Sequence, residues 1–181
     1  MMSSALWRRL DLMGHDAARL DTLDDGYLLR GTAVFRDPAG PARLAYLVVC
    51  ARDWTTRRGR VTGRIGARDV NCRVVRDAGG WTLNGERAES LDHCVDLDFG
   101  FTPATNLQQL KRIALAVGAS AEVPVAWLDT SDALMELPQT YERRSQTTYW
   151  YKAPSVGYAG LLELAPSGFI HRYPGLWEAE G

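Results

Sequence analysis

The stretch "GRVTGRIGARD", residues 59–69, alternates between two kinds of side chain. Its small and apolar members fall on one face of an extended chain: Val61, Gly63 and Ile65. Its polar members fall on the other face: Arg60, Thr62, Arg64 and Arg68. A period of two residues is typical of a β-strand that buries one face and exposes the other, so this stretch indicates a sheet protein.

The same period extends outward from this stretch. Residues 27–36 alternate and end in the turn sequence Asp37–Pro41. Residues 44–51 are apolar on both faces, which predicts a central strand that is covered on both sides. Residues 70–85 predict a hairpin with its turn at 77–80. Strands at this spacing predict an all-β meander, sandwich or barrel.

The second half of the chain continues the pattern. We expect further strands in six segments: 94–99, 112–117, 122–129, 139–152, 156–164 and 169–173. Helix is scarce, and the candidates are a short helix at 105–111 and a weaker one at 129–137. The prediction is a mainly β single domain, 1–181, with one large coiled antiparallel sheet, a meander in half-barrel or open-barrel form, and one or two short helices. With so little helix to cover it, the curved sheet is expected to enclose a cavity.

The composition is 46% hydrophobic with a formal net charge of −1, as in soluble globular proteins. No apolar run reaches the roughly 20 residues of a membrane helix. The N-terminus lacks the basic-then-apolar order of a signal peptide, because Arg8 and Arg9 interrupt it. Three cysteines, Cys50, Cys72 and Cys94, cannot all pair. We therefore predict a reducing, cytoplasmic location.

Positive charge is concentrated in residues 52–76, which contain eight arginines and two aspartates. Arginine is the general cation of this chain, whose only lysines are Lys111 and Lys152, so a solvated sheet face explains most of the cluster. An anion-binding surface on the strands of residues 57–76 stays open as an alternative. The near-zero total charge argues against a nucleic-acid partner.

Asp96 and Asp98 are two residues apart on a predicted strand, so their carboxylates point the same way. Such a pair can serve a hydrolase or an isomerase, alone or with a cation. The general expectation is instead the polar face of an amphipathic strand. His93 beside Cys94 does not supply the geometry of a thiol nucleophile, and the three histidines are too scattered for a zinc centre.

Thr105 and Gln108 match a capping box at the start of the predicted helix. The alternative is an anion on the free amide groups of that helix start, supported by Lys111 and Arg112. Among the aromatic residues, Trp81, Trp127, Tyr149 and Tyr151 are candidates to line a cavity, where rings offer an apolar face and a polar edge.

A set of motifs in fixed order covers almost the whole chain: Trp7-Arg8, Cys50, Trp54 to Arg57, Asp96 with Asp98, Thr102 to Asn106, Arg112, Gln139 to Tyr141, and Gly168 to Trp177. They resemble a bacterial family first filed as a domain of unknown function and then named putative glycolipid-binding. The stretch Leu107–Ile113 and the spacing before Thr102 depart from the family pattern. The resemblance implies a large coiled antiparallel sheet, similar in shape to half-barrel carriers of lipoproteins and glycolipids.

The sequence therefore predicts non-enzymatic binding of an amphiphile, a glycolipid or another acyl-bearing molecule, in the concave face of the sheet. The resemblance brings no catalytic residue, and no metal or cofactor is predicted. The acyl part is expected along the inward strand faces, and the head group near the polar candidates. The predicted ligand-binding residues are Asp96, Asp98, Thr105, Asn106, Arg112, Trp81, Trp127, Tyr141, Tyr149 and Tyr151.

Overall fold

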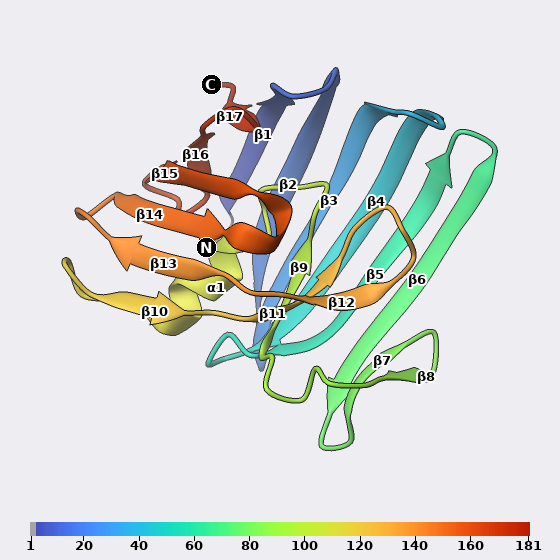
Figure 1. The fold of residues 1–181 in the computed structure, drawn as a ribbon, viewed down its shortest axis with the longest axis horizontal. Coiled ribbons are helices and arrows are strands. Elements are labelled where there is room, and N and C mark those ends of the chain that lie inside the picture. The colour runs from blue at the N-terminus through green and yellow to red at the C-terminus, as the bar shows by residue number, and fades with distance from the viewer. Residues whose placement is uncertain (1–2) are drawn as a thin grey trace.

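The computed structural model of the chain describes residues 3–181 (Figure 1). Strands hold 60% of the residues and helix 6%, which confirms the mainly β fold class. Fourteen strands form one antiparallel sheet that does not close, called sheet A here. Its spatial order is β10 (Ser120–Glu122), β13 (Thr140–Arg143), β14 (Thr148–Ala153), β15 (Tyr158–Leu164), β16 (Ile170–Tyr173), β17 (Trp177–Ala179), β1 (Ser3–Arg9), β2 (Gly14–Leu23), β3 (Gly26–Asp37), β4 (Gly40–Ala51), β5 (Thr56–Ile65), β6 (Arg68–Asp77), β7 (Gly80–Leu83) and β8 (Glu86–Ala88).

Three other strands form a small sheet B in the order β12 (Leu134–Leu137), β11 (Val125–Leu128) and β9 (Asp96–Phe99). The single α-helix of residues 3–181 is α1 (Asn106–Ile113), and a 3-10 turn, η1, spans Pro154–Val156. No helix in this part of the chain is long and apolar enough to cross a membrane. In Figure 1 the long strands β2–β6 run steeply through the view, β13–β15 run across them, and α1 and sheet B lie between these two arms.

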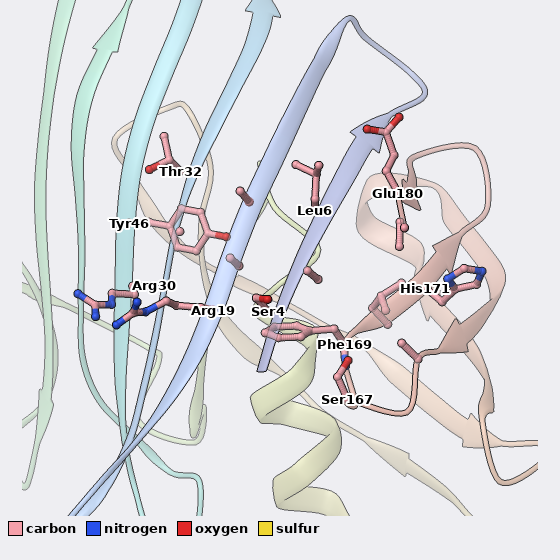
Figure 2. Close-up of a pocket in the computed structure, with 18 of the residues that line it drawn as sticks. Ser4, Leu6, Arg19, Arg30, Thr32, Tyr46, Ser167, Phe169, His171 and Glu180 are labelled. Carbon is pink, nitrogen blue, oxygen red and sulfur yellow. The ribbon is translucent and has the colours of Figure 1, made fainter. Parts of the chain in front are cut away.

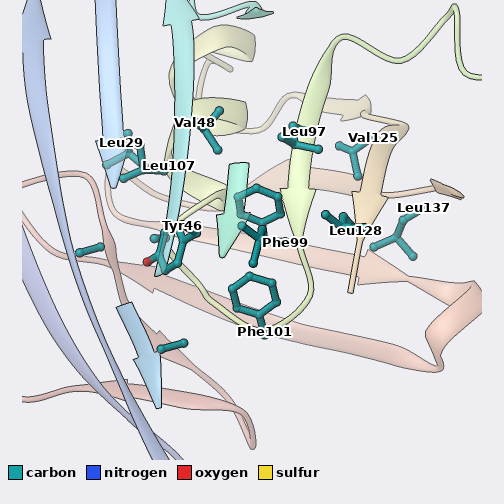
Figure 3. Packing of buried hydrophobic residues seen from close by; sticks show 14 of the residues in the cluster. Leu29, Tyr46, Val48, Leu97, Phe99, Phe101, Leu107, Val125, Leu128 and Leu137 are labelled. Carbon is teal, nitrogen blue, oxygen red and sulfur yellow. The ribbon is translucent and has the colours of Figure 1, made fainter. Parts of the chain in front are cut away.

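Alternation along the long strands decides which face of sheet A is buried. The inner face carries Leu29, Ala33, Phe35, Leu44, Tyr46, Val48, Val61, Cys72 and Val74, all buried. Sheet B and the segment that follows it supply the matching rings, because Phe99 stacks on Phe101 at 5.5 Å and Tyr46 meets the edge of each at 5.9 Å (Figure 3). Gly59 permits this approach, since a Cβ there would lie 2.2 Å from Leu97 Cδ2.

The expectation that the curved sheet encloses a cavity is therefore wrong for the inward faces of its long strands. Sheet B and α1 occupy the concave side, and the buried side chains form one continuous hydrophobic core. Burial of a core of this kind is the main favourable term in folding. Leu97 and Leu107 lie at its centre, each 1% exposed or less, so the inward strand faces offer no free surface for an acyl chain.

Three local predictions also need correction. Residues 129–137 contain no helix, because β12 pairs with β11 from Leu134 to Leu137. Residues 112–117 are not a strand, because α1 runs to Ile113 and ends at Ala114 in a left-handed conformation, with φ of 41°. Residues 139–152 form two strands rather than one, because the chain turns between Arg143 and Thr148, where the amide of Ser145 donates to the carbonyl of Thr148.

Candidate functional site

The chain places Asp96 and Asp98 on β9, the strand of sheet B that lies next to α1. Both carboxylates bond to residues in or beside α1, as strand geometry requires for positions i and i+2. Both are buried, with 0% and 6% of their surface exposed. Leu97 and Phe99, which alternate with them, are buried on the other side. The interpretation of these acids as a solvated strand face is wrong, because sheet A and α1 cover both faces of β9.

Asp96 is held by a charged partner. Arg112 donates from Nε to both carboxylate oxygens at 3.0 Å and from Nη2 to Oδ2 at 2.6 Å. Burial raises the pKa of Asp96, and the guanidinium counteracts this by stabilising the charged form. Because Arg112 is committed to this bidentate ion pair, it is not free to hold an anion at the start of α1.

Asp98 is held by neutral donors. Thr105 Oγ1 donates to its Oδ1, and Gln139 Nε2 donates to its Oδ2 at 2.8 Å. Burial raises the pKa of Asp98, because these bonds compensate only part of the lost hydration.

The prediction that Thr105 and Gln108 form a capping box is wrong, because both side chains bond to β9. The Thr105 hydroxyl accepts from the amide of Phe99 at 3.2 Å, and the Gln108 side chain donates to the carbonyl of Leu97. Thr105 has helical dihedral angles and makes no side-chain capping bond. These polar side chains fasten α1 to β9 instead of capping the helix.

A pocket of about 300 Å³ opens beside Asp98, at the end of β9. Its polar lining includes Asp98, Thr102, Asn106 and Asp129. Its aromatic lining is Phe99, Trp127, Tyr151, Tyr158, Tyr173 and Trp177. The elements that meet here are sheet B, the start of α1, and strands β14 to β17 of sheet A, so the pocket lies between sheet B and these strands.

The three tyrosines of this pocket contact one another. Ring centroids lie 5.8 Å apart for Tyr151 and Tyr158, 5.7 Å for Tyr151 and Tyr173, and 5.0 Å for Tyr158 and Tyr173. The Tyr158 hydroxyl donates to the carbonyl of Pro174 at 2.8 Å. Burial raises the pKa of Tyr158 to about 12, so this phenol stays neutral near pH 7. The wall is apolar in its faces and uncharged at its hydroxyl edges.

A buried hydrogen-bond network supports the polar side of the pocket. Asn106 Nδ2 donates to the Tyr141 hydroxyl at 2.8 Å, and that hydroxyl donates to Gln109 Oε1 at 2.7 Å. Gln139 links this network to Asp98. Such a network fixes the orientation of Asn106 and Asp98 before any ligand arrives. Neutral donors, acceptors and rings beside the carboxyl groups of Asp98 and Asp129 suit a hydroxyl-rich molecule.

The predicted site residues fall into three groups. Four line the pocket: Asp98, Asn106, Trp127 and Tyr151. Thr105 and Tyr141 lie behind its wall, bonded to Asp98 and Asn106. The other four lie away from the pocket. Asp96 and Arg112 form their ion pair, and Trp81 and Tyr149 lie in the core. Trp81 Nε1 donates to the carbonyl of Cys94 at 3.0 Å.

Sequence reasoning missed several lining residues. Thr102, Tyr173 and Trp177 lie within the motifs quoted for the family resemblance, so a signal for them was present. Tyr158 and Asp129 had no such signal. Within residues 3–181, no three His, Cys, Asp or Glu side chains converge to hold a metal ion. Burial raises the pKa of Cys94 to about 12, which keeps this thiol protonated and unreactive near neutral pH.

Two larger hollows lie on the opposite, outer face of sheet A. One has a volume of about 1040 Å³ and is lined by parts of β1–β4 and the C-terminal segment (Figure 2). The other, of about 1050 Å³, crosses β3–β6 and reaches β7. Both are wide grooves, and the small pocket beside Asp98 differs from them because its Asp98 and Asn106 are buried and oriented by the network behind them.

Comparison with known proteins gives a consistent result. A family model described as "Putative glycolipid-binding" matches residues 4–179. The chain is also similar to the crystal structure of a DUF1089 family protein from Pseudomonas aeruginosa, solved at 1.80 Å resolution. The TM-score is 0.79 at 24% sequence identity, over 90% of this chain and 91% of that chain, which shows a shared fold. The curated proteins give no match. Since the family model spans nearly all of the sequence, the chain belongs to the putative glycolipid-binding family.

Proposed function

We propose that the protein binds, without catalysis, an amphiphile such as a glycolipid, and that the pocket beside Asp98 receives its sugar head group. One observation carries the proposal: Asp98 and Asn106, both buried and held in place, face a wall of aromatic rings within one pocket. The family name points to the same class of ligand.

The chemistry of the lining suits a sugar ring. A pyranose has C–H groups on its faces and hydroxyl groups around its edge. Trp127 and Trp177 line the pocket and supply apolar ring surface for the former, while Asp98 would accept hydrogen bonds from the latter. A site built to hydrogen-bond hydroxyl groups discriminates strongly against ligands that lack them.

The size of the pocket limits which part of the ligand enters. A volume of about 300 Å³ is at the small end of ligand pockets, so it takes a head group and not the acyl chains as well. Because sheet B and α1 cover the inward strand faces, the chains would lie outside the pocket. Val156, which lines the pocket and is 50% exposed, offers them an apolar rim.

The Asp96/Asp98 pair gives less support to a hydrolase or an isomerase. The two acids have separate partners, and of the two only Asp98 lines the pocket. A reaction that needs both carboxylates on one substrate would require the Asp96–Arg112 ion pair to open.

The test is a titration followed by NMR with n-octyl β-D-glucoside below its micellar concentration. Methyl β-D-glucoside and octanoate serve as the sugar-only and chain-only arms, and native mass spectrometry of gently purified protein reports any lipid that stays bound. We expect both glucosides to shift the Trp127 indole and Asn106 side-chain signals, and octanoate to leave them unchanged.

Variants locate the binding within the pocket. Trp127→Ala should weaken glucoside binding by at least about tenfold, as expected for a central aromatic contact. Trp150→Ala is the matched control, because Trp150 is half-buried on β14 and does not line the pocket. Equal loss in both variants, or no glucoside binding and no co-purified lipid, would contradict the proposal.

A further inference from the structure

The outer face of sheet A carries a row of arginines that runs across the strands. In spatial order from β2 to β6, the residues directly opposite one another are Arg19, Arg30, Leu47, Arg60 and Arg73. Side chains in such register on one face lie about 5 Å apart at Cβ. The row therefore gathers four guanidinium groups along one line, with a leucine at its centre.

The positive charge of this row is uncompensated at one end. Arg19 and Arg30 share Asp21, at 3.1 and 3.0 Å. Among residues 3–181, no carboxylate lies within 4.0 Å of Arg60 or Arg73, nor of Arg58, which points the same way two residues earlier on β5.

All three of these arginines are exposed. Like charges directly opposite on a sheet destabilise it, and a bound anion would remove that cost.

These three arginines border the groove of about 1050 Å³ that crosses β3–β6. Its floor is aliphatic: Leu28 and Leu47 are half-buried and Val49 is 8% exposed. The turn at Asn84 and Gly85, after β7, forms one end. No aromatic ring is among its lining residues. The groove thus combines an apolar floor with a strip of free positive charge.

The adjoining groove of Figure 2 is a weaker candidate for an anion. The two grooves meet at Leu47. Figure 2 shows Arg19 and Arg30 side by side at the edge of this second groove, where Asp21 already neutralises part of their charge. Glu180 adds a further negative charge to its lining. The free positive charge of this face lies on the β5–β6 side.

We propose that the groove across β3–β6 binds one anionic phospholipid molecule. Arg60 and Arg73 hold the phosphate, with Arg58 in reach along β5, because guanidinium groups match phosphate oxygens in geometry and charge. The acyl chains lie on Leu28, Leu47 and Val49, and the aliphatic arginine stems border them. Single-stranded nucleic acid fits less well, because stacking platforms for bases are missing from this lining.

This site is independent of the sugar pocket, because the two lie on opposite faces of sheet A. The test uses three water-soluble compounds at low salt: dihexanoyl phosphatidic acid, dihexanoyl phosphatidylcholine and inorganic phosphate. Titration calorimetry should show that phosphatidic acid binds more tightly than either of the others. The double variant Arg60→Gln/Arg73→Gln should weaken its binding at least about tenfold, since two charge-assisted hydrogen bonds are removed.

Two further variants separate charge from apolar contact. Arg64→Gln is the matched control, because Arg64 lies on the same strand and face but contacts Asp69 at 3.5 Å, and it should bind as the unchanged protein does. Leu47→Ser should weaken the binding of phosphatidic acid without affecting the binding of inorganic phosphate. Trp127→Ala should leave phosphatidic acid binding unchanged, which keeps this result separate from that of the sugar pocket.

Several results would overturn the proposal. If the double variant bound phosphatidic acid as tightly as the unchanged protein, Arg60 and Arg73 would not be part of the site. Inorganic phosphate that binds as tightly as phosphatidic acid would show an anion site without a lipid role. A single-stranded oligonucleotide that binds more tightly, with affinity lost in the double variant, would assign this face to nucleic acid.

Discussion

The two ends of β9 hold their buried carboxylates by different means. At one end Asp96 meets the Arg112 guanidinium in a bidentate ion pair. At the other end Asp98 meets a hydroxyl and an amide, and it lines the pocket. Asp16, on β2, resembles Asp98, because its Oδ2 accepts from the Tyr46 hydroxyl at 2.8 Å and from Thr102.

This difference separates structural charge from chemistry that a ligand can use. A paired carboxylate has its charge balanced within the fold, so it adds little to recognition. Asp98 has only neutral partners, so its charge is not balanced by an ion pair, and it lines the pocket where a ligand hydroxyl can reach it. The Arg112 end of β9 thus fastens α1 to sheet B, and the pocket end is where we propose that the ligand binds.

The largest effect should come from breaking the ion pair. Arg112→Met leaves Asp96 buried without its partner, and we expect a loss of about 3–5 kcal/mol in the free energy of unfolding. Urea denaturation at pH 7 measures it. Lys111→Met is the control, because Lys111 is exposed and should change stability by less than about 0.5 kcal/mol. If Arg112→Met lost no more stability than Lys111→Met, the Asp96 carboxylate would not depend on its ion pair, and the contrast with Asp98 would fail.

A smaller effect should follow from the titration of Asp16. Burial raises its pKa to about 7 from 3.8, and its Oδ1 has no hydrogen-bond partner among the described residues. A raised carboxyl pKa gives stability that is present below the unfolded pKa and is lost as pH rises towards 7. Asp16→Asn removes this dependence. The free energy of unfolding of the variant minus that of the unchanged protein should therefore rise by about 2–3 kcal/mol from pH 5 to pH 8.

Denaturation series with both proteins at the two pH values measure that gain. Subtracting the free energy of unfolding of one protein from that of the other at each pH cancels the titration of all the remaining groups, which the two proteins share. An unchanged difference between pH 5 and pH 8 would mean that Asp16 is already charged in the fold at pH 5.

Much of the fold could be predicted from local pattern, because strands β3–β6 are long and alternate over ten or more residues each. Sheet B could not. Its strands have four residues each, and β9 is buried on both faces, so its alternation of acids and apolar residues misled. The parallel pairing of β9 with β11 joins distant segments, and no local signal encodes such a contact.

The site was harder to predict than the sheet. Trp127 lines the pocket and Trp81 is in the core, yet both are tryptophans on short strands. Sequence period cannot tell a buried ring from a pocket ring, because both point inward. Arg112 beside Asp96 is a tertiary pairing between α1 and β9, which only the folded chain brings together.

The smallest effect should come from Asp98 itself. Asp98→Asn keeps the shape and one acceptor oxygen but disturbs the bond with Thr105, so we expect a loss of about 0.5–1.5 kcal/mol in stability. The same variant should weaken glucoside binding, because one acceptor of the pocket becomes a donor. Asp96→Asn is the matched control: it should cost more stability, because it removes the charge that Arg112 needs, and leave glucoside binding unchanged. Crossed results, with binding lost only in Asp96→Asn, would place the ligand at the Arg112 end of β9.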